Sequence, residues 1–88
     1  MDREKYEAAI RRIADINGIY NQRDKLVEEL SELLVAITHD YLGNMLEEMA
    51  DVRIMIDQMA YIYDAEEVVE KLMEKKIKRT LERMEVEG

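Results

Sequence analysis

The apolar residues of this chain recur at the spacing of an α-helix, and this periodicity constrains the fold more than any other feature. Between residues 22 and 40, the apolar side chains form one helical stripe, made by Leu26, Leu30, Leu33, Leu34 and Ile37. No stretch shows the apolar–polar alternation of a half-buried strand. Because the chain has no proline and only three glycines, few positions can interrupt a helix. The sequence therefore predicts an all-α protein.

Three weak points divide the helical pattern. Gly18 is a plausible helix stop. At Gly43 one helix is expected to end, and Asn44 is expected to begin the next, because Asn44 and Glu47 have the spacing of a capping box. Asp64 begins a third motif of the same spacing. The predicted fold is a four-helix antiparallel bundle with helices near residues 3–16, 22–40, 45–63 and 65–85.

The size of the chain limits its core. The 88 residues allow one domain, expected over residues 1–88, and a chain this short leaves a large share of its surface exposed. The predicted helix 45–63 has one apolar stripe made by Met45, Met49, Val52, Ile56, Met59 and Tyr63, and further apolar residues around it, namely Ile54, Met55, Tyr61 and Ile62. We expect a second copy of the chain to cover the additional apolar surface, as a homodimer or homotetramer. The alternative is a monomer core in which methionines fill gaps.

The charge and composition argue against several classes of partner and location. The net charge is −8, with 21 acidic and 13 basic residues, which disfavours non-specific nucleic-acid binding. No apolar run is long enough to span a membrane, and the charged start MDREKYEAAI does not resemble a secretory signal. The absence of cysteine removes disulfides, zinc–thiolate sites and thiol chemistry, and it fits a reducing compartment. We expect a cytoplasmic protein without nucleic-acid or membrane partners.

Two acidic pairs share one spacing. Glu29 and Glu32 are three residues apart, as are Glu48 and Asp51, so each pair lies within about 60° on one helix face, beside the apolar stripe. A short turn near residues 42–44 makes the two helices antiparallel and brings the pairs to one seam. Hard divalent cations, and Mg²⁺ in particular, take such oxygen ligands. Glutamate is also the ordinary surface residue of a helix, so the spacing alone leaves both interpretations open.

The acidic residues also carry a resemblance to a known family. Glu28-Glu29-x-x-Glu32, followed after fifteen residues by Glu48-x-x-Asp51, resembles the EExxE…ExxD signature of the MazG-like superfamily of all-α nucleoside triphosphate pyrophosphohydrolases. The segments NQRDKLVEELSELLVAI and LEEMADVRIMIDQM resemble the second and third helices of that family. The segment KKIKRTLERMEVE resembles the basic C-terminal segment of its short members. The resemblance covers roughly residues 17–85.

The resemblance implies a function and a set of ligands. It implies Mg²⁺-dependent hydrolysis of a (d)NTP by metal-activated water, giving (d)NMP and pyrophosphate, in nucleotide pool sanitation or dNTP control. Glu29, Glu32, Glu48 and Asp51 would be the Mg²⁺ ligands, with Mn²⁺ as a possible substitute. Glu28 would be the catalytic base, a group that supports the ligands or a plain surface acid. The chain has no Ser–His or Cys–His pair to suggest a covalent nucleophile, which agrees with direct attack by water.

A triphosphate also needs cationic partners. Lys76, Arg79 and Arg83 lie within about 60° of one another on the last predicted helix. They flank an apolar stripe made by Val69, Met73, Ile77, Leu81 and Met84. Arginine can bind phosphate oxygens through two hydrogen bonds, and lysine adds a point charge. Alternatively, these basic residues complement the helix dipole near the C-terminus.

Four further residues are weaker candidates. Lys25, one turn before Glu29, could reach a phosphate or simply pair with the carboxylate. Gln22, another turn back, could hydrogen-bond a base or sugar, and Tyr20 is the best-placed tyrosine to stack on a base. His39 is the one histidine, and without the Glu-x-x-His pairs of di-iron bundles it is expected to be a helix-end residue.

Two other functions compete with this interpretation. Phosphoribosyl-ATP pyrophosphohydrolase shares the fold and a Lys-x-x-Glu-Glu run that matches Lys25 to Glu29. Against it, Asp51 is followed by Val-Arg-Ile-Met-Ile and not by the expected Leu-Leu-Tyr-His. The second alternative is a non-catalytic, nucleotide-binding helical oligomerisation module. The breaks at Gly18 and Gly43 prevent the long heptad of a coiled coil, and all four presumed ligands are present, which favours an enzyme.

Overall fold

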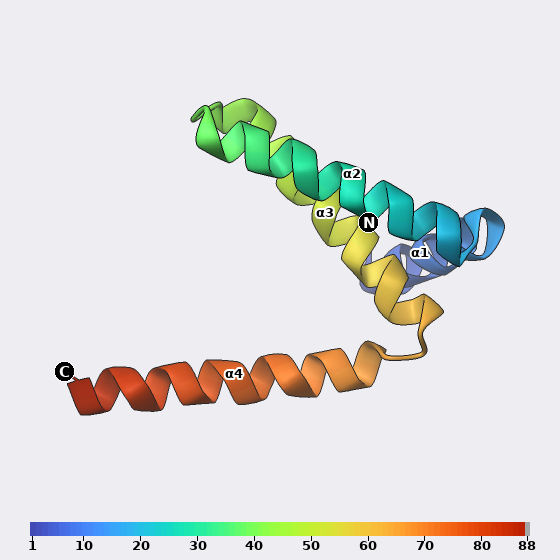
Figure 1. Ribbon diagram of the computed structural model, residues 1–88. Coiled ribbons are helices and arrows are strands. Elements are labelled where there is room, and N and C mark those ends of the chain that lie inside the picture. Colours follow the sequence, from blue (N-terminus) through green and yellow to red (C-terminus); the bar gives the residue numbers. More distant parts are fainter. Residues whose placement is uncertain (88) are drawn as a thin grey trace.

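The computed structural model describes residues 1–87, which form four α-helices and no strand (Figure 1). These helices are α1 (Arg3–Asn17), α2 (Ile19–Thr38), α3 (Leu42–Ile62) and α4 (Glu66–Glu87). The predicted all-α fold is confirmed, although α2 and α3 each begin three residues earlier than predicted. Among residues 1–87, no helix combines the length and apolar character that crossing a membrane requires.

At the junction between α1 and α2, the predicted helix stop at Gly18 is confirmed, whereas the predicted connection before residue 22 is already helical. Asp2 caps α1, because its side chain accepts a hydrogen bond from the backbone N–H of Lys5 at 2.8 Å. Gly18 then takes φ 81° and ψ 163°, a backbone conformation that essentially only glycine adopts. Its N–H still donates to the carbonyl of Ala14 at 2.9 Å. The chain therefore changes direction at Gly18 and starts α2 without an intervening loop.

The turn between α2 and α3 differs from the prediction, which placed it at Gly43 and Asn44. Asp40 takes the left-handed conformation with φ 55°, and the N–H of Tyr41 donates back to an α2 carbonyl at 3.1 Å. Gly43 and Asn44 both lie inside α3, so the predicted Asn44–Glu47 capping box is wrong. The prediction failed because an aspartate occupies the left-handed position that a glycine usually fills.

Helix α3 also ends at an aspartate in the left-handed conformation. Asp64 has φ 52°, and the N–H of Ala65 donates to the carbonyl of Ala60 at 2.8 Å. Asp64 therefore ends α3, and Ala65 separates it from Glu66, where α4 begins. The predicted capping motif that starts at Asp64 is therefore wrong, because Asp64 lies at the end of α3.

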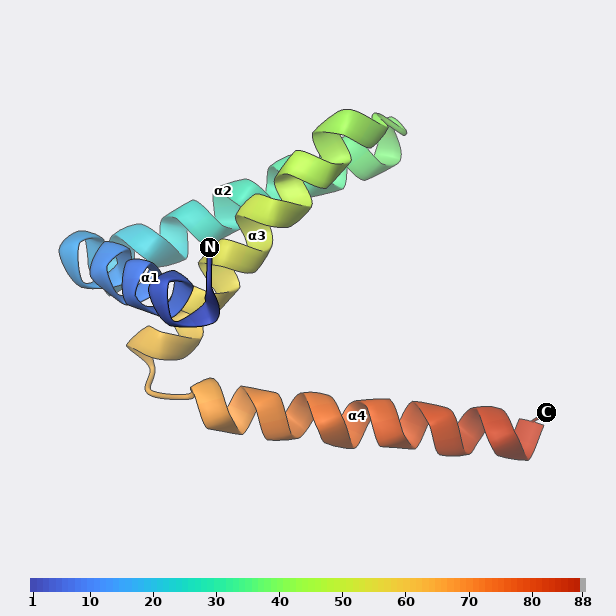
Figure 2. The same cartoon turned by 180° about the vertical axis from the view of Figure 1, so that it is seen from behind.

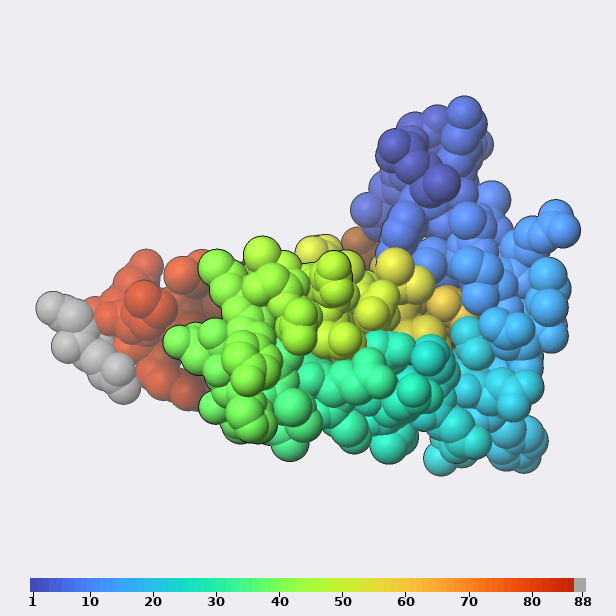
Figure 3. Space-filling view, turned by 90° about the horizontal axis from the view of Figure 1, so that it is seen from above, coloured from blue at the N-terminus to red at the C-terminus, as the bar shows by residue number. Residues whose placement is uncertain are grey.

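The antiparallel pair α2–α3 forms the centre of the molecule, and α1 packs against α3 (Figures 1 and 2). In the space-filling view, α2 and α3 form one continuous layer, from which α1 projects at the end away from their turn (Figure 3). The buried apolar core is small and consists of Ile10, Ala14, Ala36, Val52 and Met55.

Hydrogen bonds between side chains fix α1 on α3. The Tyr6 hydroxyl donates to Asp57 at 2.6 Å, and the Tyr61 hydroxyl donates to Asp15 at 2.9 Å. Because each hydroxyl donates to a carboxylate, the pKa of both tyrosines is raised. Arg11 lies over the Tyr61 ring at 5.5 Å and so joins the same contact.

The last helix, α4, contacts α3 near the junction of the two helices and otherwise extends away from the α2–α3 pair (Figures 1 and 2). Arg11 on α1 pairs with Glu66 at its start at 3.4 Å, and α4 has no contact with α2. Every side chain from Lys71 to Val86 is exposed. The apolar stripe of α4 is therefore uncovered along most of its length, with Met73, Ile77, Leu81 and Met84 each more than half exposed.

Candidate metal centre

Three of the four predicted metal ligands meet in the seam between α2 and α3. Carboxylate oxygens of Glu29, Glu48 and Asp51 all lie within 4.8 Å of one another. Glu29 comes from the middle of α2, and the other two come from successive turns of α3 that run past it in the opposite direction. Glu29 is buried, Glu48 is half-buried and Asp51 is exposed, so this acidic cluster opens to solvent on one side.

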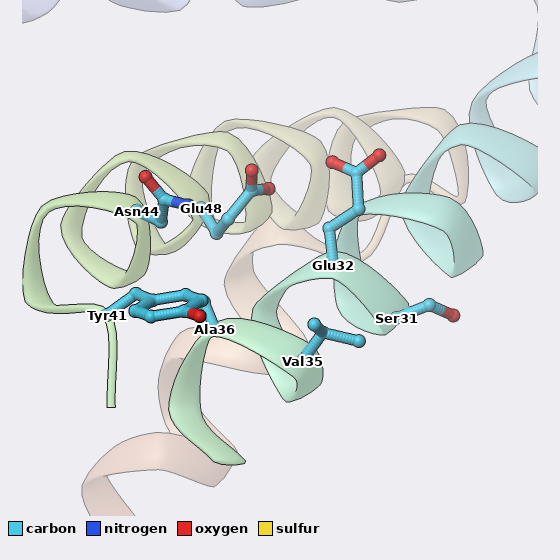
Figure 4. Close-up of a pocket in the computed structure, with 7 residues that line it drawn as sticks. All are labelled: Ser31, Glu32, Val35, Ala36, Tyr41, Asn44 and Glu48. Carbon is cyan, nitrogen blue, oxygen red and sulfur yellow. The ribbon is translucent and has the colours of Figure 1, made fainter. Parts of the chain in front are cut away.

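The fourth predicted ligand, Glu32, approaches from the next turn of α2. Its side chain is exposed and lies outside the group of three. It still faces the same space as Glu48 from the opposite helix (Figure 4), and its charge helps to raise the pKa of Glu48. All four carboxylates therefore belong to one region of the seam.

Two carboxylates of the acidic cluster, those of Glu29 and Glu48, have opposite electrostatic environments. The Lys25 ammonium lies 3.1 Å from Glu29 Oε1 and lowers the pKa of Glu29, whereas the pKa of Lys25 is raised. Burial, followed by the nearby carboxylates of Glu29 and Glu32, raises the pKa of Glu48 to about 7. The negative charge of the cluster is thus compensated by a lysine at Glu29, whereas Glu48 has no cationic partner of this kind among residues 1–87.

Two oxygen atoms of the acidic cluster are buried without a hydrogen-bond partner. They are Oε2 of Glu29 and Oε2 of Glu48. A buried carboxylate oxygen without a partner is costly, and a bound cation is one way to satisfy it. The donor set consists of carboxylate oxygens alone, which suits a hard divalent ion such as Mg²⁺ or Mn²⁺. The residues present therefore fit a metal ion.

The remaining predicted residues of α2 lie around the acidic cluster or below it. Glu28 is exposed, outside the cluster, and its Oε2 lies 3.7 Å from Lys25 Nζ. Gln22 is buried and donates a hydrogen bond to the buried Gln58, so its amide is used within the fold. Tyr20 is exposed at the start of α2. Sequence reasoning missed Gln58, whose residue type is usually found on the surface.

The basic residues predicted to bind phosphate are not brought to the acidic cluster by their own chain. Lys76, Arg79 and Arg83 are exposed on the part of α4 that stands apart from the other helices. His39 follows the last residue of α2, as predicted for a helix-end residue. Its ring stacks on Tyr41 with centroids 5.7 Å apart.

A pocket of about 390 Å³ adjoins the acidic cluster on the side of the α2–α3 turn (Figure 4). It is lined by Ser31, Glu32, Val35, Ala36, Tyr41, Asn44 and Glu48. Sequence reasoning did not single out Tyr41 or Asn44 for this place. The one sequence feature that could have pointed to these two residues is that they lie near the turn between the helices. The turn itself was predicted a few residues too late in the sequence.

Comparison with known proteins gives one match. The family model of the MazG nucleotide pyrophosphohydrolase domain matches residues 20–84. Comparisons with curated proteins and with solved structures found no match. The matched segment contains both acidic pairs and spans α2, α3 and most of α4, well over half of the chain. The chain therefore belongs to the family of MazG nucleotide pyrophosphohydrolase domains.

Proposed function

We propose that this protein is a Mg²⁺-dependent nucleoside triphosphate pyrophosphohydrolase that converts a (d)NTP to (d)NMP and pyrophosphate. The observation that carries the proposal is the acidic cluster of Glu29, Glu48 and Asp51, with its two buried carboxylate oxygens that lack a partner. Membership of the MazG family supports the reaction class. Mn²⁺ is a possible substitute because it accepts the same oxygen ligands.

The charged residues of the seam divide into three roles in the proposed reaction: metal ligands, a phosphate contact and a base. Glu29, Glu32, Glu48 and Asp51 would hold the ion, which when bound would neutralise triphosphate charge and lower the pKa of water. Lys25 keeps Glu29 ionised, and its half-exposed ammonium would contact a phosphate oxygen of the substrate. Water oxygen bonds to the α-phosphorus as the bond from that phosphorus to the bridging oxygen breaks, and pyrophosphate leaves. Glu28, exposed beside Lys25, is the candidate base that takes the water proton.

We further propose that a second copy of the chain completes the site. The uncovered apolar stripe of α4 lies beside Lys76, Arg79 and Arg83, and burial of such a stripe against another copy would stabilise both chains. The opposite charges of these three residues and of the acidic cluster favour the same pairing. In the homo-oligomer, the basic residues of one copy would bind the triphosphate held at the carboxylates of the other.

The second candidate is phosphoribosyl-ATP pyrophosphohydrolase. The ion pair of Lys25 with Glu29, within the Lys-x-x-Glu-Glu run, favours it. The residues that follow Asp51 do not match the run expected for that enzyme. A third possibility is a module that binds nucleotide and assembles without catalysis, and it makes the clear prediction that no substrate is turned over.

Incubation of the purified protein with Mg²⁺ and a panel of substrates tests these functions. The panel contains the canonical NTPs and dNTPs, triphosphates with modified bases, and phosphoribosyl-ATP. Monophosphate plus pyrophosphate from an NTP or dNTP supports the proposal, and preference for modified bases would favour a role in pool sanitation. Exclusive turnover of phosphoribosyl-ATP favours the second candidate. No turnover of any compound, with nucleotide binding retained, favours the non-catalytic module.

A further inference from the structure

The pocket at the α2–α3 turn is continuous with the acidic cluster. Glu48 belongs to both, and Glu32 lines the pocket from the opposite helix (Figure 4). From Glu48 to Asn44 along α3 is one helical turn, a rise of about 6 Å. A nucleotide whose phosphates are bound at the cluster can therefore place its other end in this pocket.

The opposite direction along the seam leads to the buried core. There, towards α1, the side chains of Gln22, Val52, Met55 and Gln58 are buried. Lys25 lies on this side of the cluster and supplies a positive charge next to Glu29. The seam thus has a cation at one end and a pocket at the other, which orients a nucleotide with its phosphates towards Lys25 and its nucleoside towards the turn.

The lining of the pocket suits a planar base with a polar edge. None of its seven lining residues is cationic, and its two carboxylates, Glu32 and Glu48, are proposed metal ligands, so away from a bound ion the pocket offers a phosphate no positive charge. Tyr41 presents an exposed ring that is supported by the stacked His39 ring, with 22° between their planes. Val35 and Ala36 add apolar surface, and the Asn44 amide offers both a donor and an acceptor. The volume of about 390 Å³ falls within the range of small-molecule sites.

We infer that this pocket binds the nucleoside part of the substrate, with the Tyr41 ring stacked on the base and the Asn44 amide hydrogen-bonded to its edge. The inference rests on the proposed function, because it takes the acidic cluster as the place where the phosphates are bound. It assigns recognition of the base to residues near the turn, outside the acidic motif.

Calorimetric titration with an uncleavable nucleotide tests the inference without relying on turnover. The probes are α,β-methylene analogues of a purine and of a pyrimidine nucleoside triphosphate in Mg²⁺, and inorganic triphosphate, which lacks a nucleoside. Tyr41→Leu is expected to weaken binding of both analogues about tenfold, because stacking on the ring is lost. Asn44→Leu is expected to weaken the binding of at least one analogue, because a hydrogen bond to the base is lost. Neither variant should change the affinity for inorganic triphosphate.

Two further variants control for indirect effects. Tyr41→Phe keeps the ring and is expected to bind the analogues like the wild type. Tyr63→Leu removes another exposed tyrosine, which lies at the far end of α3, and it should also bind normally. Sedimentation velocity on each variant reports whether the pocket is instead covered by another copy of the chain.

The possible outcomes separate this inference from the proposed function. If Tyr41→Leu binds the analogues as tightly as the wild type, the nucleoside assignment is overturned. If that variant also sediments as a smaller species than the wild type, Tyr41 lies in a contact between copies of the chain instead. If Tyr41 is required for binding but no triphosphate is ever hydrolysed, the subsite stands and the proposed activity falls. If the wild type binds neither analogue and hydrolyses no triphosphate, both are wrong.

Discussion

At the scale of single residues, the balance of charge around Glu48 distinguishes this seam from an ordinary acidic helix surface. Glu29 has Lys25 as a partner, whereas Glu48 is half-buried among other carboxylates and its pKa is raised to about 7. Each residue also leaves one buried oxygen without a hydrogen bond. Such an arrangement destabilises the metal-free protein, and a function that uses a cation explains why it is present.

The raised pKa of Glu48 predicts how stability depends on pH. The folded protein binds the Glu48 proton more tightly than the unfolded chain, whose glutamate has the ordinary pKa of 4.5. The stability of the metal-free protein should therefore fall as the pH rises from about 4.5 through 7. Glu48→Gln removes this titration. In thermal denaturation with EDTA, the variant should melt above the wild type at pH 8 and close to it at pH 5.

A neighbouring glutamate provides the control for this experiment. Glu47 is exposed and outside the acidic cluster, so Glu47→Gln should change the melting temperature little at either pH. Addition of Mg²⁺ should raise the melting temperature of the wild type and not that of Glu48→Gln. An equal difference between Glu48→Gln and the wild type at both pH values would contradict the assigned environment of Glu48.

The sequence predicted which acidic residues meet in the seam between α2 and α3, but it did not predict the surroundings of the neutral residue Gln22. The three-residue spacing puts each acidic pair on one helix face, and the antiparallel turn between the helices brings Glu29 next to Glu48 and Asp51. Gln22 was expected to contact substrate, yet it is buried against Gln58. Helical spacing does not reveal that two glutamines can replace apolar side chains in a core when they satisfy each other.

At the scale of elements, two of the three helix junctions depend on aspartates in the left-handed conformation, Asp40 and Asp64. Only the junction at Gly18 uses the residue type that sequence rules expect at such a position. This explains why the start of α2 was predicted from the right glycine, whereas the α2–α3 turn was predicted several residues too late. The register of the turn matters for function, since it places Tyr41 and Asn44 beside the acidic cluster.

The two glycines described by the structure should respond oppositely to substitution by alanine. Gly18→Ala should lower the free energy of unfolding by about 1–3 kcal/mol, because an alanine is strained at this backbone conformation. Gly43 lies in α3, and a Cβ added there meets nothing within 4 Å. Gly43→Ala should therefore raise the free energy of unfolding by about 0.5 kcal/mol.

Urea denaturation of both variants measures these changes. The wild type and both variants should share one m-value, so that a shift of the midpoint reports stability directly. Loss of stability in Gly43→Ala would show that the turn between α2 and α3 needs a glycine after all, as the sequence first indicated.

At the scale of the whole molecule, α4 is the helix whose apolar stripe is not buried within a single chain. Its apolar stripe and the basic residues Lys76, Arg79 and Arg83 are exposed, while the acidic cluster lies on helices that α4 does not cover. The sequence predicted the helix and its stripe, because both are local properties. It could not predict where α4 packs. That depends on whether the stripe is more stable against the other helices of its own chain or against another copy.

Assembly through α4 can be tested with one matched pair of substitutions. Ile77 belongs to the exposed apolar stripe, and Lys75 lies on the opposite face of the same helix. Ile77→Gln should shift the protein towards monomer in sedimentation velocity and make it less stable, because less apolar surface is buried. Lys75→Gln should sediment like the wild type. A monomeric wild type would contradict assembly through this helix.

Mixing two inactive variants tests whether α4 acts on another copy. Asp51→Asn removes a proposed metal ligand, and Arg79→Ala removes a proposed phosphate contact. If the two residues come from different copies, hybrid oligomers contain some intact sites, and part of the activity should return on mixing. No recovery from well-mixed hybrids would place Arg79 and Asp51 of one chain in the same site.

The most direct test of the central claim is mass analysis of the products formed from a nucleoside triphosphate in ¹⁸O-labelled water. With Mg²⁺, the wild type should release pyrophosphate and a monophosphate that carries the label, because water attacks the α-phosphorus. Glu29→Gln and addition of EDTA should each abolish both products. Release of diphosphate and inorganic phosphate, or unchanged activity in Glu29→Gln, would contradict hydrolysis at the acidic cluster of α2 and α3.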